Sequence, residues 1–208
     1  MDKPPRGTAL ERVFETLIGG VFERGYGLTE GFVAASTVEG LRQRLLTHRR
    51  NGEMYPAGVG RHFDFQHNAK VRGDVIRWID NDSPAPDECD WLAAVGGFIS
   101  YLNRSCYTGL CDFEFHYASY QRGSGYARHL DQFRDDKRRK FSLLLYLNDN
   151  WTDSDGGELV LYPEDAEPVV VAPLGGRVVF FRSDQLAHEV RPSLSRERLS
   201  LAGWLKAR

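Results

Sequence analysis

The sequence predicts an α+β protein, mainly β, in which helices come first and a series of short strands follows. Apolar residues recur at helical spacing in the first half of the chain. Short apolar or alternating stretches, separated by Gly- and Pro-containing turns, fill the second half. Short strands with regular turn signals are typical of a sandwich or jelly-roll. We therefore expect one domain of residues 1–208, with helical support at about 8–108 and a double-stranded β-helix (jelly-roll) core at about 111–205.

The three expected helices are bounded by recognisable end signals. Thr8 can cap the first helix, with Glu11 three residues later as in a capping box. Asn51-Gly52 stops the second, and Asp87 lies where the third needs a cap. These helices are expected to buttress one face of a sheet. They span about 8–23, 29–50 and 87–108.

The strand signals begin between the second and third helices. Residues 54–82 are predicted to form two short strands joined by a long, mobile loop at about 56–70. From Cys111 onward the chain is predicted to be mostly strand, with Gly-rich turns such as 123–125 and 155–157 between the strands. The strands expected there span 111–120, 140–147, 158–161, 168–171, 177–181, 187–191 and 198–205.

The composition suits a globular protein and disfavours two classes of partner. Hydrophobic residues make up 41% of the 208 residues, which is ample for a buried core. A formal net charge of −2 provides no whole-protein field for nucleic acid, and no apolar run approaches the roughly 18–20 residues that span a bilayer. No nucleic-acid or membrane partner is expected. Three cysteines cannot all pair and no secretory signal is evident, so we expect a cytoplasmic location.

The most informative residues are His129 and Asp131, followed further along the chain by His188. Residues two apart in an extended chain project from one face, so His129 and Asp131 can converge on one ion. Two imidazoles and a carboxylate can take three adjacent corners of a metal and leave three for small ligands, as in non-haem Fe(II) oxygenases. His-x-Asp triplets are common by chance. The turn before this one and the hydrophilic stretch around His188 favour a metal site.

The other histidines are weaker candidates. His48 ends a helix, where the dipole favours a cation. His62 and His67 fall in the predicted mobile loop, where solvation is favoured over adventitious metal binding. His116 lies among strand aromatics and is expected to be packed and hydrogen-bonded.

Four segments carry a family resemblance: 120–131, which ends in YARHLD, 145–157 (LYLN with a later Gly-Gly), 188–204 (HEV with a later Arg and Trp) and 71–79 (VRGDVIRWI). Together they resemble the 2-oxoglutarate- and Fe(II)-dependent prolyl 4-hydroxylases. The fourth segment is characteristic of the branch that contains the oxygen-sensing (HIF-type) prolyl hydroxylases of animals and their bacterial relatives. The resemblance covers about residues 70–205.

The resemblance implies a cofactor set and the residues that hold it. His129, Asp131 and His188 look like the Fe(II) ligands, while Arg198 would bind the distal carboxylate of 2-oxoglutarate, helped by the Tyr146 hydroxyl. An Arg fork recognises a carboxylate through two charge-assisted bonds, which suits this role. O₂ is the other co-substrate, succinate and CO₂ are the implied by-products, and ascorbate is a candidate reductant.

The same resemblance implies further contacts, each with a plainer alternative. Tyr120 would lie against the co-substrate and Tyr126 would line its pocket, although both could be strand aromatics that pack the core. Arg72 and Asp74 resemble a pair that anchors a substrate-closing loop, but could be an ordinary surface ion pair. The residues implied to contact the substrate are Arg72, Asp74, Arg139 and Trp204.

One spacing leaves a choice of arginine. The interval from His188 to Arg198 differs by one residue from that in the animal enzymes, so Arg196 is a rival for the carboxylate. On a strand that begins near Arg198, Ser200 and Ala202 share its facing, which favours Arg198.

The resemblance implies hydroxylation of a prolyl residue in a protein substrate, with the loop at about 56–70 as a lid. Bacterial members of the branch suggest elongation factor Tu as a candidate substrate. Two alternatives stay open: a hydroxylase of a free amino acid or small metabolite, and a non-catalytic 2-oxoglutarate- or oxygen-sensing binding module. Nucleic-acid demethylation is disfavoured because the near-neutral charge provides no phosphate-binding stripe.

Overall fold

The computed structural model describes residues 8–58, 71–133 and 136–208. Its elements are α1 (Ala9–Arg24), β1 (Tyr26–Thr29), α2 (Ala35–Arg50), β2 (Tyr55–Pro56), β3 (Asp74–Trp78), α3 (Pro86–Cys106), β4 (Leu110–Tyr120), β5 (Tyr126–His129), β6 (Arg139–Tyr146), the 3₁₀ turn η2 (Asp153–Asp155), β7 (Leu159–Tyr162), β8 (Val169–Val171), β9 (Val178–Arg182), β10 (Ala187–Val190) and β11 (Arg198–Ala207). Nearly all of the loop predicted at about 56–70, with His62 and His67, lies outside the described residues. None of the described helices is long and apolar enough to cross a membrane.

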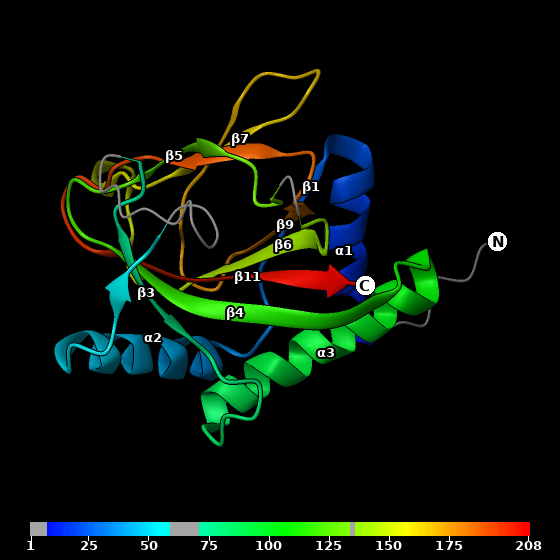
Figure 1. Ribbon diagram of the computed structural model, residues 1–208, viewed down its shortest axis with the longest axis horizontal. Coiled ribbons are helices and arrows are strands. Elements are labelled where there is room, and N and C mark those ends of the chain that lie inside the picture. The colour runs from blue at the N-terminus through cyan, green and yellow to red at the C-terminus, as the bar shows by residue number, and fades with distance from the viewer. Residues whose placement is uncertain (1–7, 59–70, 134–135) are drawn as a thin grey trace.

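The strands form two antiparallel sheets that face each other (Figure 1). The larger sheet has the order β1-β9-β6-β11-β4-β3-β2, and the smaller one has the order β5-β10-β7-β8. The three helices lie against the outer face of the larger sheet, as Figure 1 shows. The predicted α+β, mainly β jelly-roll with supporting helices is therefore confirmed.

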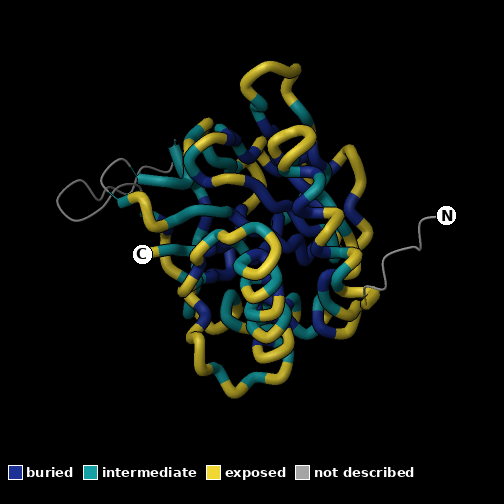
Figure 2. Tube along the Cα trace, turned by 90° about the vertical axis from the view of Figure 1, so that its right-hand side faces the viewer, coloured by how far each residue is buried: buried dark blue, intermediate teal, exposed yellow. Residues whose placement is uncertain are grey.

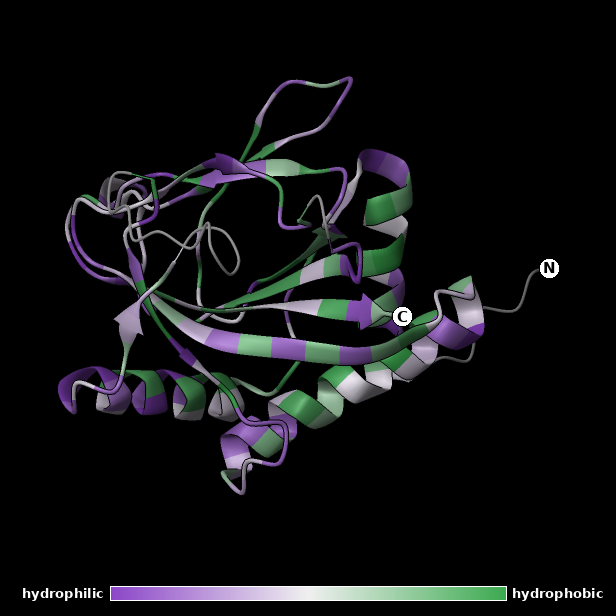
Figure 3. Cartoon of the chain, viewed as in Figure 1, coloured by the Kyte–Doolittle hydropathy of each residue, from purple (hydrophilic) through white to green (hydrophobic). Residues whose placement is uncertain are grey.

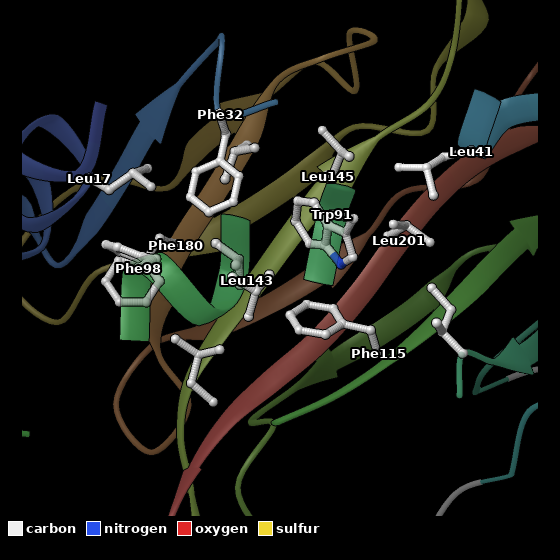
Figure 4. Close-up of a cluster of buried hydrophobic side chains, with 14 of the residues drawn as sticks. Leu17, Phe32, Leu41, Trp91, Phe98, Phe115, Leu143, Leu145, Phe180 and Leu201 are labelled. Carbon is white, nitrogen blue, oxygen red and sulfur yellow. The ribbon is translucent and has the colours of Figure 1, made fainter. Parts of the chain in front are cut away.

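Each helix contributes buried apolar side chains to one cluster on this outer face (Figure 4). Leu17 of α1, Leu41 of α2 and Trp91 of α3 are fully buried there with Phe115 of β4 and Leu201 of β11. Burial of a large apolar side chain stabilises a fold by about 1.5–3 kcal/mol. The helices thus fix the backs of the strands whose other face lines the space between the sheets.

Strand β4 shows how the sequence divides between the two faces. Figure 3 shows it alternating between hydrophilic and hydrophobic residues. Phe115 and Tyr117 pack in the helix-side cluster, while Ala118 and Tyr120 belong to the cluster between the sheets. The buried residues accordingly gather in the middle of the molecule, as Figure 2 shows. The inter-sheet face of β4 is therefore available to form a site.

The prediction for the second helix was wrong at its start. The helix begins at Ala35 rather than Thr29, and residues 26–29 form strand β1 at the edge of the larger sheet, paired with β9. Gly27 permits this arrangement because a Cβ there would lie 2.2 Å from the carbonyl oxygen of Leu17. Helix α1 can therefore pack directly on the backbone of β1, a long-range contact that local periodicity does not reveal.

The first helix follows its prediction, whereas the cap of the third does not. Thr8 and Glu11 form the expected capping box. Helix α3 begins at Pro86, a favoured first helical residue, so Asp87 lies inside the first turn instead of capping it. The Asp87 carboxylate is paired with Arg44 of α2, which joins the two helices.

Candidate active site

The three predicted metal ligands meet at the mouth of the space between the sheets. His129 ends β5, Asp131 lies two residues later, and His188 on the adjacent strand β10 is directly paired with His129. Their ligand atoms lie within 4.8 Å of one another. Nε2 of His129 is 3.5 Å from Oδ1 of Asp131, and Nε2 of His188 is 3.6 Å from its Oδ2. Within residues 8–58, 71–133 and 136–208, this is the one group of three or more such side chains that could hold a metal.

Backbone hydrogen bonds orient both imidazoles toward this point. Nδ1 of His129 donates to the carbonyl of Ala127 at 2.8 Å, and Nδ1 of His188 donates to the carbonyl of Leu186 at 3.1 Å. A carbonyl can only accept, so each Nδ1 carries the proton and each Nε2 keeps a lone pair for a metal. Burial lowers the pKa of His188, which favours the neutral, ligating form.

The Asp131 carboxylate is held in its ionised form. Burial opposes ionisation, but the facing imidazoles of His188 and His129 and a hydrogen bond from Ser142 outweigh it and hold the pKa of Asp131 below its usual value. Two imidazoles and one ionised carboxylate are therefore presented together, the donor set that suits a non-haem Fe(II) ion.

A column of stacked side chains supports the His129 imidazole. The Tyr126 ring lies 3.6 Å from it at an interplanar angle of 17°, and the Arg72 guanidinium lies over the Tyr126 ring at 4.8 Å. Asp74 receives hydrogen bonds from Arg72 of 2.7 and 3.0 Å and is buried. The Arg72–Asp74 pair is therefore not the exposed ion pair considered as the alternative, because it is largely buried and stacks through Tyr126 on His129.

Arg198 lies at the inner part of the same cavity, on the first residue of β11. Its guanidinium faces the rings of Tyr120 and Tyr146 at about 5 Å, and its Nε donates to the carbonyl of Gly157 at 2.8 Å. Among the described residues, neither Nη2 of Arg198 nor the hydroxyl of Tyr146 has a hydrogen-bond partner, although both are buried. Two donors thus converge without an acceptor.

Arg196, the alternative candidate for the carboxylate, forms its hydrogen bonds outside the cavity. Its Nη2 donates to the carbonyls of Asp149 and Asn150 and to the Asp155 carboxylate, and its guanidinium stacks on Trp151. The cavity lining contains Arg198 but not Arg196.

A known protein family and several solved structures are similar to this chain. The family model of the 2OG-Fe(II) oxygenase superfamily matches residues 115–206, which hold all three ligands and Arg198. A prolyl-4-hydroxylase from Pseudomonas putida is 36% identical, with a TM-score of 0.84, and the match covers 94% of this chain and all of that one. The chain belongs to the 2OG-Fe(II) oxygenase superfamily.

Several of its relatives within the superfamily are prolyl hydroxylases. A prolyl hydroxylase from Trichoplax adhaerens, solved with a hypoxia inducible factor peptide fragment, is 27% identical with a TM-score of 0.85, over 95% of this chain and 90% of that one. Rat Egl nine homolog 1 is 31% identical over 144 residues, which are 64% of this chain and 41% of the relative. The hypoxia-inducible factor prolyl hydroxylase of Caenorhabditis elegans is 26% identical over 206 residues, or 94% of this chain. The chain spans 41% and 28% of the lengths of these two curated relatives.

The residues fit the cofactors that this superfamily uses, namely Fe(II), 2-oxoglutarate and O₂. The His129, Asp131 and His188 donor set suits Fe(II). The unpaired donors on Arg198 and Tyr146 match a carboxylate, which has acceptor sites alone. A carboxylate bound there would accept a hydrogen bond from each of them.

The remaining predicted contacts lie around the same cavity. Trp204 lines it, and Arg139 lies over the Trp204 ring at 3.4 Å while pairing with Glu114. His116 also lines the cavity; it is buried as expected, but its Nδ1 lacks a hydrogen-bond partner in the described part of the chain. The Trp78 and Trp204 rings flank its imidazole, with ring centroids 4.9 and 5.5 Å away.

Sequence reasoning missed several lining residues and the support of Asp131. Leu144, Leu159 and Val190 line the cavity with apolar side chains. Ser142, on β6, donates to Oδ2 of Asp131 at 2.6 Å. The available signal was a lone polar residue in the apolar stretch FSLLLY, at a position that faces the space between the sheets.

Proposed function

We propose that this protein hydroxylates a prolyl residue of a protein substrate, using Fe(II), 2-oxoglutarate and O₂ and releasing succinate and CO₂. One observation carries the proposal. A preassembled triad of His129, Asp131 and His188 shares a cavity with Arg198, and among the described residues the buried Nη2 of Arg198 and the hydroxyl of the adjacent Tyr146 have no hydrogen-bond partner.

The chain's residues divide the work by position. His129 and His188 offer their Nε2 atoms, and Asp131 offers a negative charge that would offset part of the metal's charge. Arg198 and Tyr146 hold the distal carboxylate of 2-oxoglutarate. When bound, Fe(II) together with 2-oxoglutarate and O₂ supplies the oxidising chemistry that replaces C–H by C–OH, while the protein positions the reactants.

The cavity walls select for a small dicarboxylate. Leu144, Leu159 and Val190 present apolar side chains beside the Arg198 guanidinium. An apolar wall next to a buried cation suits the methylene groups of a five-carbon diacid and strengthens its charge-assisted bonds, because water is displaced.

We assign the substrate class from the relatives and from the outer part of the cavity. The Trichoplax adhaerens relative was solved with a protein-derived peptide. Trp204 lines the cavity six residues along β11 from Arg198, with the Arg139 guanidinium stacked on its ring, and an aromatic residue with a cation beside it would suit a peptide segment. We propose elongation factor Tu as the first substrate to test, a cytoplasmic location, and ascorbate as the reductant that keeps the iron active.

The test is incubation of the purified protein with Fe(II), ascorbate, 2-oxoglutarate and elongation factor Tu, followed by peptide mass spectrometry. The expected product carries one added oxygen on a proline, formed together with succinate. An Asp131→Ala variant is the matched control and should produce neither. Consumption of 2-oxoglutarate without modification would rule out elongation factor Tu but leave the oxygenase assignment intact.

A further inference from the structure

Ser142 and Ser183 form a buried hydroxyl pair behind Asp131. Ser142 Oγ lies 2.6 Å from Oδ2 of Asp131 and 2.9 Å from Oγ of Ser183. Both serines are fully buried. Backbone hydrogen bonds also join these segments. The amide of Gln132 donates to the carbonyl of Ser183 at 3.0 Å, and the amide of Ser183 donates to the carbonyl of Lys140 at 3.1 Å.

The direction of these hydrogen bonds follows from counting protons. An ionised carboxylate only accepts, so the single hydroxyl proton of Ser142 points to Asp131. The 2.9 Å contact then requires Ser183 to donate to Ser142. Each donor in such a chain polarises the next and strengthens its hydrogen bond. Oδ2 of Asp131 therefore already has a strong, fixed partner, whereas none of the described residues donates a hydroxyl hydrogen bond to Oδ1.

The number of Asp131 oxygens that bind the metal affects how many positions are left for other ligands. His129, His188 and one oxygen of Asp131 would leave three positions of a six-coordinate metal for small ligands. A second Asp131 oxygen on the metal would take one of those three positions. Resting on the metal site of the proposed function, we infer that Ser142, supported by Ser183, is a positioning residue that holds Oδ2 of Asp131 out of the coordination sphere, so that Asp131 supplies Oδ1 alone.

The strand environment makes Ser142 a rigid support. It lies inside β6, paired in register with Phe181 of β9 on one side and Trp204 of β11 on the other. Because β6 is hydrogen-bonded to a strand at each edge, the backbone that carries the Ser142 side chain is held in place. Asp131, in contrast, follows the end of β5, so its orientation depends on such contacts.

The test measures Co(II) binding to the full-length protein, followed by titration of the Co(II)-loaded protein with 2-oxoglutarate, which needs no protein substrate. Loss of a hydrogen bond to a metal ligand typically lowers metal affinity about 10–100-fold. We expect Ser142→Ala to weaken Co(II) binding about tenfold or more and to weaken 2-oxoglutarate binding as well. Ser183→Ala should cause a smaller loss, because it removes only the polarising donor.

Ser119→Ala is the matched control. Ser119 is equally buried and its hydroxyl donates to Glu197, but it lies on the helix-facing side of β4, so both affinities should stay at the wild-type value. Thermal unfolding of the metal-free variants checks their folding. If Ser142→Ala does not fold, Ser183→Ala carries the test. Wild-type affinities in whichever folded variant is measured would overturn the role of Ser142, whereas a wild-type protein that binds no Co(II) would overturn the proposed metal site itself.

Discussion

Replacement of Arg198 by Met is the sharpest perturbation of the co-substrate site. The substitution keeps an unbranched apolar stem against Tyr120 and Tyr146 but removes the guanidinium, whose Nη2 has no partner among the described residues. A hydrogen bond to a charged group contributes about 1.5–3 kcal/mol, and Nη2 is the available guanidinium nitrogen, since Nε donates to Gly157 and Nη1 to Ser200. The loss is therefore about 1.5–3 kcal/mol, or about ten- to a hundredfold in the affinity for 2-oxoglutarate.

The assay is anaerobic calorimetric titration of the Co(II)-loaded protein with 2-oxoglutarate. Arg196→Met is the matched control, because Arg196 bonds the carbonyls of Asp149 and Asn150 outside the cavity. Arg196→Met should bind 2-oxoglutarate like the wild type, and Co(II) affinity should be similar in all three proteins. The reasoning is refuted if Arg198→Met retains wild-type affinity, or if the two substitutions weaken binding equally.

Four further outcomes are expected. Tyr146→Phe removes one of the unpaired donors and should weaken 2-oxoglutarate binding by about 1 kcal/mol, or about fivefold, in the same titration. His129→Ala or Asp131→Ala should abolish iron-dependent consumption of 2-oxoglutarate while the circular dichroism spectrum stays that of the wild type; turnover in either variant would contradict the ligand assignment. Burial lowers the pKa of His116 from 6.5 to about 3, so the folded state binds fewer protons and stability is lost as the pH falls below 6.5. His116→Phe should therefore lose about 2 kcal/mol less stability than the wild type between neutral pH and about pH 5, as measured by urea unfolding. Leu41→Ala in the helix-side cluster should lower the free energy of unfolding by about 2–5 kcal/mol in urea, and a negligible change would contradict its packing role.

The order of helices and strands could be predicted because it rests on local patterns. The capping box of Thr8 and Glu11 and the alternation of β4 are both written in neighbouring residues. Strand β1 could not be predicted in this way. It has four residues, and it exists because β9 pairs with it and Gly27 admits the backbone of α1. Such contacts join residues far apart in the chain, so local periodicity does not report them.

The candidate site likewise contains residues that local spacing predicts and contacts that it does not predict. His129 and Asp131 share a strand-end spacing that already predicts convergence, and His188 could be added from its surroundings. The structure adds what spacing cannot: the register that pairs His188 with His129, and the stack of Tyr126 on His129. Motifs did not identify the Ser142 hydroxyl, because its role depends on its hydrogen bond to Asp131, which lies eleven residues earlier in the chain.

We propose that the protein incorporates an oxygen atom from O₂ into a prolyl residue of a protein substrate. The most direct measurement exposes a cell extract to the enzyme, Fe(II), 2-oxoglutarate and isotopically heavy O₂, with Asp131→Ala enzyme as the control, and analyses the proteins by mass spectrometry. We expect at least one protein with a hydroxyproline that carries the heavy oxygen, and none with the Asp131→Ala enzyme. Consumption of 2-oxoglutarate by the wild-type enzyme, with heavy oxygen in a free metabolite or in no prolyl residue, would contradict it.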